Sequence, residues 1–317
     1  MSFDLSVVIP LFNEDESLAE LHSKLRDVTA KHGISAELIF VDDGSKDDSW
    51  EVLKRLKSSD ADLKAVRFMR NYGKSAALNT GFSMASGAVV ITMDADLQDS
   101  PDEIPELIKL IKEDGYDLVS GWKRKRFDPI SKTLPTKLYN WATRKMSGID
   151  LHDFNCGLKA YKLEVVQNIE VFGEMHRYIP VIAHREGYTE IGEKEVAHSP
   201  RKYGVTKFGY ERFINGFLDL LTITFISRFG KKPMHLFGTL GTLMFLIGFF
   251  MFAFIGGSKL YYLYAEIPAK NIAEQSSFFI ALTAMVVGTQ LFLAGFLGEL
   301  ISRNAPHRNL YQVREKI

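Results

Sequence analysis

The sequence predicts an α/β protein in which a mostly parallel sheet with flanking helices is followed by an interfacial amphipathic helix and two transmembrane helices. Two observations predict this: short β-rich runs alternate with helical segments through residues 1–120, and two long uncharged segments follow. The 317 residues are 46% hydrophobic and 25% charged, which excludes disordered and fibrous classes. Basic and acidic residues balance at 39 each, so the overall charge indicates no nucleic-acid partner.

The expected strands are short runs rich in β-branched and other apolar residues. They are Leu5–Phe12, Glu37–Val41, Leu63–Met69, Ala88–Met93 and Asp117–Gly121. The first helix between them carries Leu18, Leu21, Leu25 and Val28 on one face and is expected to end at Gly33. Ser45 is the expected N-cap of the second helix. This alternation predicts helices on both faces of the sheet, with ligands bound at the carboxyl ends of the strands.

Two apolar segments predict membrane spans. Lys232 and Lys259 bracket 26 uncharged residues, and Glu274 and Glu299 bracket another 24. Each segment exceeds the roughly 20 helical residues that cross about 30 Å of hydrocarbon. The expected spans are 235–257 and 276–298, and the loop between them is 258–275. Glycines in both spans permit close helix packing, either between these two helices or between chains.

Basic residues are distributed unevenly around the two spans. Seven lie on the outer flanks, whereas the connecting loop has only Lys259 and Lys270. Because basic residues concentrate on the cytoplasmic side of a membrane, both chain ends are expected in the cytoplasm. The expected organisation is a cytoplasmic domain at 1–209 and a cytoplasmic tail at 299–317.

The segment 210–234 connects the soluble domain to the first span. Between Tyr210 and Phe229, apolar residues recur at helical spacing with polar and charged residues between them. This pattern is typical of a helix that lies in the membrane interface. It equally fits an amphipathic helix packed on the soluble domain, so both alternatives stay open.

Three polar clusters follow strands of the predicted sheet. They are Pro10–Glu14, Val41–Ser45 and Met93–Gln98. The third contains Asp94 and Asp96 in a D-x-D arrangement directly after a strongly apolar strand. Carboxylates in this pattern suit Mg²⁺ or Mn²⁺, and such an ion can bridge a diphosphate. A D-x-D alone is more often a surface turn, but the other two strand ends favour a metal site here.

The motifs together carry a family resemblance that runs along nearly the whole chain. In order they are VVIPLFNE, VDDGSKDDS, NYGKSAALNTGF, MDADLQDSP, DFNCGLKAY at 153–161, HRYIP at 176–180 and SPRKYGVTKFG at 199–209. This ordered set resembles the family 2 glycosyltransferases with a GT-A fold, in the polyprenyl-phosphate branch of dolichyl-phosphate mannose synthase-like and undecaprenyl-phosphate glucosyltransferase-like enzymes. The resemblance implies a metal-dependent enzyme that uses Mg²⁺ or Mn²⁺.

The resemblance also implies a role for each matching position. The nucleotide-binding residues would be Pro10, Asn13, Glu14, Asp42, Lys74 and Asp94, with Asp42 as the contact to the base. The metal ligands would be Asp94, Asp96 and Gln98. The acceptor-phosphate residues would be Lys123, Arg126, Arg201 and Lys207. The catalytic residues would be Asp96, Arg201 and Lys207.

Several of these residues have a second interpretation. Asp153 is a further candidate for a catalytic carboxylate that orients acceptor or metal, but a turn-capping aspartate explains it equally well. The basic run 123–126 is also typical of a solvated loop or of a contact with an anionic surface. His176 and Arg177 are weaker candidates for ligand contacts.

The resemblance implies inverting transfer of one sugar from a nucleotide-diphosphate sugar to undecaprenyl or dolichyl phosphate, at the cytoplasmic face of a bacterial inner membrane. A UDP-linked donor such as UDP-glucose is favoured by analogy alone. The absence of an Arg-Trp dipeptide from the chain argues against processive synthesis. Contacts with membrane lipid and homo-oligomers are further implications. Two alternatives remain: transfer to a lipid or glycan hydroxyl, and a catalytically silent nucleotide-binding scaffold.

Overall fold

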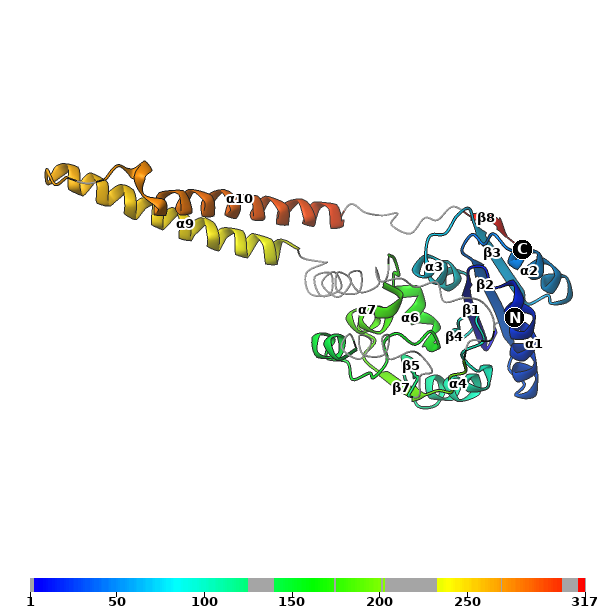
Figure 1. The fold of residues 1–317 in the computed structure, drawn as a ribbon. Helices are drawn as coiled ribbons and strands as arrows, with labels where there is room; N and C mark the ends of the chain where they lie inside the picture. Colours follow the sequence, from blue (N-terminus) through cyan, green and yellow to red (C-terminus); the bar gives the residue numbers. More distant parts are fainter. Residues whose placement is uncertain are drawn as a thin grey trace. The chain divides into compact units, whose positions relative to one another are not determined.

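The computed structural model describes residues 3–124, 140–173, 175–200, 202, 233–268, 270–303 and the backbone of 313–316. The described chain divides into two compact units. One unit contains the residues up to 202 together with 313–316, and the other contains the helices between 233 and 303. Figure 1 shows the sheet and its helices in the first unit and two long helices in the second.

The first unit is built on an eight-stranded sheet with the order β7-β5-β6-β4-β1-β2-β3-β8. The strands are β1 Leu5–Leu11, β2 Ala36–Asp42, β3 Leu63–Phe68, β4 Val89–Thr92, β5 Leu118–Trp122, β6 Lys159–Lys162, β7 Ile191–Glu195 and β8 Val313–Lys316. β1 pairs in parallel with β2 and β4, and β2 with β3. β6 is antiparallel to β4 and β5, so the sheet is mixed around a parallel centre.

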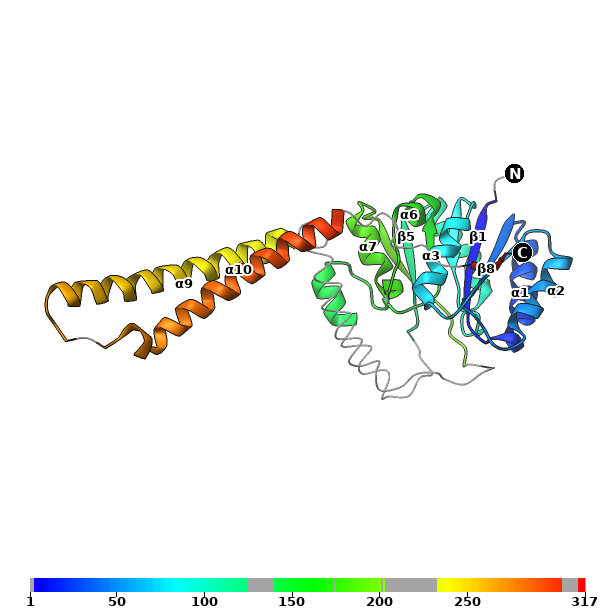
Figure 2. The ribbon, with the colours of Figure 1, turned by 90° about the horizontal axis from the view of Figure 1, so that it is seen from above.

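Helices cover both faces of this sheet (Figures 1 and 2). In chain order they are α1 Asp15–Lys31, α2 Ser49–Ser59, α3 Lys74–Met84, η1 Pro101–Glu103, α4 Ile104–Lys112, α6 Leu163–Asn168, η2 Met175–Tyr178 and α7 Ile179–Arg185. On one face, Val7 and Ile9 of β1 join a buried cluster that includes Leu21 of α1. On the other face, Gly81 of α3 lies against Val8 so closely that a Cβ would be 2.3 Å from a Val8 methyl carbon.

The five strands predicted from sequence are confirmed, with ends shifted by no more than two residues. The buried face of the first helix is confirmed as well, and Gly33 follows its end with a φ of +64°. The prediction for Ser45 was wrong. α2 begins at Ser49, and Asp48 takes the N-cap position. The Ser45 amide instead donates to Asp42 Oδ1 at 2.8 Å, which holds Ser45 in a loop at the end of β2.

The last strand comes from the segment expected to be a simple tail. β8 pairs antiparallel with the edge strand β3, with Val66 opposite Lys316 and Phe68 opposite Val313. The chain therefore leaves the first unit before the long helices and returns to it after them. A four-residue strand with charged residues has no apolar alternation to mark it, so the sequence pattern did not predict it.

The second unit is a hairpin of α9 Pro233–Tyr264 and α10 Ser276–Arg303, with η3 Ile272–Glu274 between them. α9 continues past residue 257, where the first span was expected to end. A Cβ at Gly241 would lie 2.5 Å from the carbonyl oxygen of Gly288, and one at Gly248 would lie 2.7 Å from that of Ala281. These glycines therefore allow the two helices of one chain to pack closely.

Both helices are long and apolar enough to cross a membrane. In an apolar 18-residue segment of each helix, only 17% is buried against the described residues. Large side chains such as Phe250 and Phe254 are exposed along the hairpin. A core helix of a soluble domain would be mostly covered by protein, so length, composition and exposure together favour membrane association.

Candidate active site

The three polar clusters lie at one edge of the sheet. β1 pairs in parallel with both β2 and β4, so the carboxyl ends of these strands are neighbours. Pro10 lies in β1 opposite Val41, and Asp42 ends β2. Asp94 follows β4. The parallel pairing thus brings together clusters that are far apart in the sequence, as expected for ligand sites in such sheets.

Asn13 connects the loops after β1 and β2. Its backbone amide donates to Ser45 Oγ at 2.8 Å, and its side-chain Oδ1 accepts from the Lys46 amide at 2.8 Å. The φ of Asn13 is +53°, in the left-handed region that asparagine tolerates better than most residues. Glu14 follows, and its amide donates to Ser49 Oγ at 3.0 Å. These bonds fix the first two loops relative to each other.

An open pocket of about 660 Å³ lies beside β3 and the loop after β2. Its lining consists of Phe12, Gly44, Ser45, Lys46, Arg67, Phe68, Met69, Arg70 and Asn71. Asp42 lies behind this lining with a buried side chain. Arg67 Nε is 3.4 Å from Asp42 Oδ2, and Arg67 Nη2 donates to the Ser45 carbonyl at 2.7 Å. Desolvation raises the pKa of the Asp42 carboxyl, against the effects of Ser45 and Arg67.

Asp43 holds the loop that leads into α3. Its two carboxylate oxygens accept from the Tyr72 amide at 2.6 Å and the Gly73 amide at 2.9 Å. Burial raises the pKa of Asp43 to about 6, although both amide donors oppose the change. Lys74 follows Gly73 directly and begins α3. Asp43 therefore positions the backbone from which Lys74 extends.

Lys74 and Asp94 form an ion pair at the centre of this edge. Lys74 Nζ is 2.5 Å from Asp94 Oδ1, and both side chains are half-buried. Desolvation alone would raise the pKa of Asp94, but Lys74, then Lys123 and His176, lower it to about 2. A Cβ at Gly157 would lie 2.4 Å from Asp94 Oδ2. Only glycine therefore lets the 155–157 backbone approach this ionised carboxylate.

Asp96 and Gln98 lie on the tight loop after Asp94. The Gln98 amide donates to Asp96 Oδ1 at 3.2 Å, and Leu97 between them has a φ of +60°. Such a conformation in a leucine is uncommon and costs about 1–3 kcal/mol, which the surrounding structure must offset. The Gln98 carbonyl accepts from the Ser199 amide at 2.9 Å, so this loop contacts the start of the 199–209 motif.

The chemistry of this loop fits a divalent metal ion. Asp94, Asp96 and Gln98 offer hard oxygen donors, and the low pKa keeps Asp94 ionised at neutral pH. Within the described ranges, no group of three or more His, Cys, Asp or Glu side chains converges on one point. The donor set therefore suits an ion such as Mg²⁺, which commonly takes one or two carboxylates and completes its shell with water and phosphate oxygens.

The candidate acceptor residues are only partly described. Lys123 Nζ lies 2.6 Å from Asp99 Oδ1, and its side chain is only 11% exposed. The pair raises the pKa of Lys123 in spite of desolvation. Lys123 is thus engaged with a buried carboxylate that sequence reasoning did not identify. The remaining predicted residues, Arg126, Arg201 and Lys207, lie outside the described residues.

Asp153 adopts a capping arrangement. Its side chain is buried, and its Oδ1 accepts from the Asn155 amide at 3.0 Å. Its own amide donates to Glu193 of β7 at 3.0 Å. These bonds fix the turn that leads to Gly157, which is the structural alternative that the sequence left open for this aspartate.

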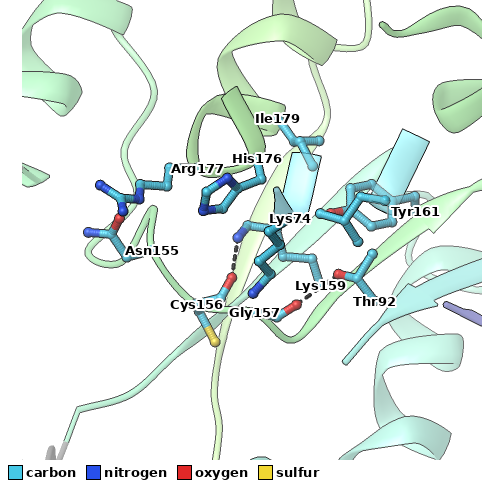
Figure 3. Close-up of a pocket in the computed structure, with 11 residues that line it drawn as sticks. Lys74, Thr92, Asn155, Cys156, Gly157, Lys159, Tyr161, His176, Arg177 and Ile179 are labelled. Carbon is cyan, nitrogen blue, oxygen red and sulfur yellow. Dashed lines mark hydrogen bonds between the residues drawn. The ribbon is translucent and has the colours of Figure 1, made fainter. Parts of the chain in front are cut away.

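A second, narrow pocket lies on the β6 side of Asp94 (Figure 3). Its lining is Lys74, Leu78, Thr92, Asn155, Cys156, Gly157, Lys159, Tyr161, His176, Arg177 and Ile179. Lys159 Nζ donates to the Cys156 carbonyl. His176 is placed by Ser75, whose Oγ lies 3.1 Å from His176 Nδ1 and accepts from the His176 amide at 3.0 Å. The pocket joins residues about a hundred positions apart in the chain.

Sequence reasoning did not identify Asp43, Asp99 or Lys159 as site residues. All three lie inside a quoted motif, so position in a motif was the available signal. Their partners, however, are backbone groups or the Lys123 side chain, whose location depends on the complete fold. Arg177 was only a weak candidate, because nothing in the sequence shows that η2 lies beside Lys74.

The chain is similar to known proteins along most of its length. Residues 6–170 match the family model described as Glycosyl transferase family 2. The dodecaprenyl-phosphate galacturonate synthase of Rhizobium johnstonii is 32% identical over 305 residues, which cover 95% of this chain and 88% of the relative. The undecaprenyl-phosphate 4-deoxy-4-formamido-L-arabinose transferase of Pectobacterium atrosepticum is 35% identical over 301 residues, with coverage of 95% and 88%.

Solved structures support the fold. Glucosyl-3-phosphoglycerate synthase from Mycobacterium tuberculosis, in complex with Mn²⁺, UDP-glucose and phosphoglyceric acid, superposes with a TM-score of 0.52 at 20% identity. The match covers 69% of this chain and 80% of that one. It supports the expected GT-A-type α/β fold. The family match spans the strands that build the site, and the relatives align along nearly the whole chain. The chain therefore belongs to glycosyl transferase family 2.

Proposed function

We propose that this glycosyltransferase moves a single sugar, with inversion, from a nucleotide-diphosphate sugar to a polyprenyl phosphate. The observation that carries this proposal is the extent of similarity to the relatives. Two polyprenyl-phosphate sugar transferases align with 95% of the chain. The alignment therefore includes the α9–α10 hairpin as well as the sugar-transfer domain. A soluble acceptor would give no reason for two exposed apolar helices beside a sugar-transfer domain.

The open pocket beside β3 is the proposed nucleoside site. Phe12 and Phe68 supply apolar surface, and Arg67 and Arg70 supply positive charge toward the phosphates. Asp42, the proposed contact to the base, lies behind the lining of this pocket, and its buried Oδ2 faces Arg67 Nε at 3.4 Å. A UDP-linked donor such as UDP-glucose is part of the proposal by analogy alone. The sugars named for the two relatives differ from each other, so donor choice requires direct measurement.

Lys74, Asp94 and Asp96 form the proposed diphosphate site. Asp94 and Asp96, with Gln98, would hold Mg²⁺ or Mn²⁺, which when bound neutralises charge on the departing diphosphate. Lys74 lies within reach of the same region and adds a positive charge where negative charge develops. Asp43 keeps Lys74 in position through the Gly73 amide.

The reaction needs little proton transfer. A phosphate monoester has a second pKa near 6, so the acceptor is largely a dianion at neutral pH. One of its oxygens forms a bond to the anomeric carbon while the bond from that carbon to the diphosphate oxygen breaks. The nucleoside diphosphate leaves with the electron pair, and no proton need be removed from the acceptor. The residues of the chain therefore act by positioning and by charge stabilisation.

The chain path supports a cytoplasmic site. α9 and α10 are antiparallel helices, and the chain returns after α10 to pair β8 with β3 of the catalytic unit. The two membrane crossings thus begin and end on the same side. The excess of basic residues on that side favours the cytoplasm. The two relatives come from bacteria, which favours a bacterial inner membrane. Contacts with membrane lipid, acceptor contacts from Arg126, Arg201 and Lys207, and homo-oligomers belong to the same proposal.

Product analysis tests this function. Purified full-length protein is incubated with undecaprenyl phosphate, Mg²⁺ or Mn²⁺ and a mixture of UDP- and GDP-sugars, and the lipid fraction is read by mass spectrometry. We expect one new lipid mass, which also identifies the sugar. Sugar transferred to a hydroxyl acceptor in a parallel reaction would instead favour the first alternative. Donor binding without any product would favour a silent scaffold.

A further inference from the structure

The narrow pocket beside Asp94 has an unusual charge composition. Lys74, Lys159 and Arg177 all line it. Figure 3 shows Lys74 and Lys159 near Cys156 and Gly157, and the Arg177 guanidinium directed toward Asn155. Among the three cations, only Lys74 is paired with a carboxylate in the described part of the chain. The pocket therefore carries positive charge that the described protein does not neutralise.

Lys159 is the most buried of these cations. Lys159 is only 3% exposed. Its ammonium group donates to the Cys156 carbonyl, which carries no formal charge. Burying an ammonium group costs several kcal/mol unless it is compensated. Desolvation lowers the pKa of Lys159 and Lys74 acts in the same direction, whereas Cys156, Asp153 and Asp94 act against them. A bound anion would remove this penalty.

Arg177 is better placed than Lys159 to contact a ligand, because it is less buried. It lies in η2, is half-buried, and forms no hydrogen bond or ion pair with the described residues. A guanidinium group offers five donors in a fixed plane and binds phosphate oxygens in pairs. His176 beside it is held neutral, because burial, then Lys74 and Arg177, lower its pKa well below the usual value. The imidazole therefore adds no charge of its own, and the positive charge of the pocket comes from Lys74, Lys159 and Arg177.

The position of the pocket relates it to the direction of attack. The proposed nucleoside site lies at β2 and β3, Asp94 follows β4, and the narrow pocket begins at β6, on the other side of β4 from β1 and β2. A donor that extends from β3 to Asp94 has its diphosphate between the nucleoside and the sugar. Inversion requires the attacking oxygen to approach the anomeric carbon opposite the departing diphosphate. The β6 side is where that oxygen must come from.

We propose that Arg177, supported by Lys159, binds the phosphate group of the acceptor at this pocket, whose volume of about 10 Å³ admits one phosphate oxygen rather than the whole group. The inference rests on the proposed function and deepens it by naming a phosphate subsite. Lys123 is the predicted acceptor residue that the structure describes, and it is already paired with the buried Asp99. Arg177 and Lys159 are instead cations without a carboxylate partner among the described residues, which makes them the better counter-charges for a dianionic phosphate.

The test compares Arg177→Gln, Arg177→Lys and Arg185→Gln in full-length protein. Arg185 is exposed at the end of α7 and does not line the pocket, so it is the matched control. We expect Arg177→Gln to raise the KM for undecaprenyl phosphate about tenfold or more, with partial recovery in Arg177→Lys. UDP binding by calorimetry and the unfolding temperature should match those of Arg185→Gln.

Two kinetic results would overturn the inference. One is a higher KM for the donor or weaker UDP binding with an unchanged KM for undecaprenyl phosphate, which would assign the pocket to the donor. The other is no change in either KM. A binding arm separates this inference from the proposed function, because it needs no turnover. Farnesyl phosphate should bind the wild type and lose about tenfold in affinity in Arg177→Gln; equal binding to both proteins contradicts the subsite even if transfer occurs.

Discussion

Gly157 lies so close to Asp94 that a Cβ at this position would be 2.4 Å from the carboxylate Oδ2. Gly157→Ala must therefore displace Asp94 or the 155–157 backbone. Because misplacement of a site by about 1 Å can cost about 100-fold in rate, we expect kcat/KM to fall by about that factor. Steady-state transfer assays measure it. Gly115→Ala is the control: it strains a positive φ without contacting the site, so it should lower stability but spare kcat/KM.

Lys74→Met should separate charge from packing. Lys74 is the leading favourable contribution to the lowered pKa of Asp94, so its removal should raise that pKa from about 2 toward its ordinary value. We expect kcat/KM at neutral pH to fall by about 100-fold, because a positive charge beside the developing diphosphate is lost. In the wild type, ionised Asp94 contributes to the stability of the folded protein. This contribution is complete above the ordinary pKa of 3.8 and is lost as the pH falls through about 2. An unchanged kcat/KM would remove Lys74 from the diphosphate site.

Asp43 gives a prediction for stability against pH. Its folded-state pKa of about 6 lies above the ordinary 3.8, so the folded protein binds more protons between these values. This contribution to stability is complete below about 3.8 and declines as pH rises through about 6. Asp43→Asn cannot lose a proton and should remove that decline, which amounts to at most about 3 kcal/mol. Urea unfolding of both proteins between pH 4 and 7.5 measures the difference, and parallel curves would contradict it.

Removal of β8 should weaken donor binding. β8 pairs with β3, and β3 supplies Arg67 and Phe68 to the open pocket. Deletion of 313–317 leaves that edge of β3 without its partner, so we expect the Kd for UDP to rise by about three- to tenfold. Deletion of residue 317 alone, beyond the strand, is the control. Equal UDP affinity in both truncations would show that β8 does not support the pocket.

Asp96→Asn should change metal dependence. Chelation is expected to abolish transfer by the wild type, and added Mn²⁺ or Mg²⁺ should restore it. An amide is a weaker ligand than a carboxylate for a hard cation, so Asp96→Asn should need about tenfold more metal for half-maximal rate. Metal titrations of initial rate, with Asp102→Asn on the neighbouring η1 as control, measure this. Full activity after chelation would exclude the proposed metal role.

Much of the fold was predictable because its centre has strong patterns. β1 to β5 are apolar runs, and α1 carries a regular buried face that ends at Gly33. The later elements are harder to predict because β7 and β8 contain mainly polar or charged residues, as edge strands often do. Their place in the sheet is set by pairing with distant strands, which no local periodicity records.

The positions of several candidate site residues were predictable, but their pairings were not. The motifs indicated Asp42, Lys74 and Asp94, and parallel strands bring them to one edge. The Lys123–Asp99 pair and the pocket around Arg177 depend on contacts between separate motifs. Such contacts follow from tertiary packing, so motif spacing alone could not separate an engaged lysine from an available arginine.

The most direct measurement of the central claim is ³¹P NMR of the lipid product formed from undecaprenyl phosphate and the donor that the product screen identifies. The monoester resonance should be replaced by one phosphodiester resonance, with one nucleoside diphosphate released per product, and ¹H NMR of the same product should show an inverted anomeric configuration. A monoester resonance that persists while sugar is transferred elsewhere, or a retained configuration, would contradict the claim.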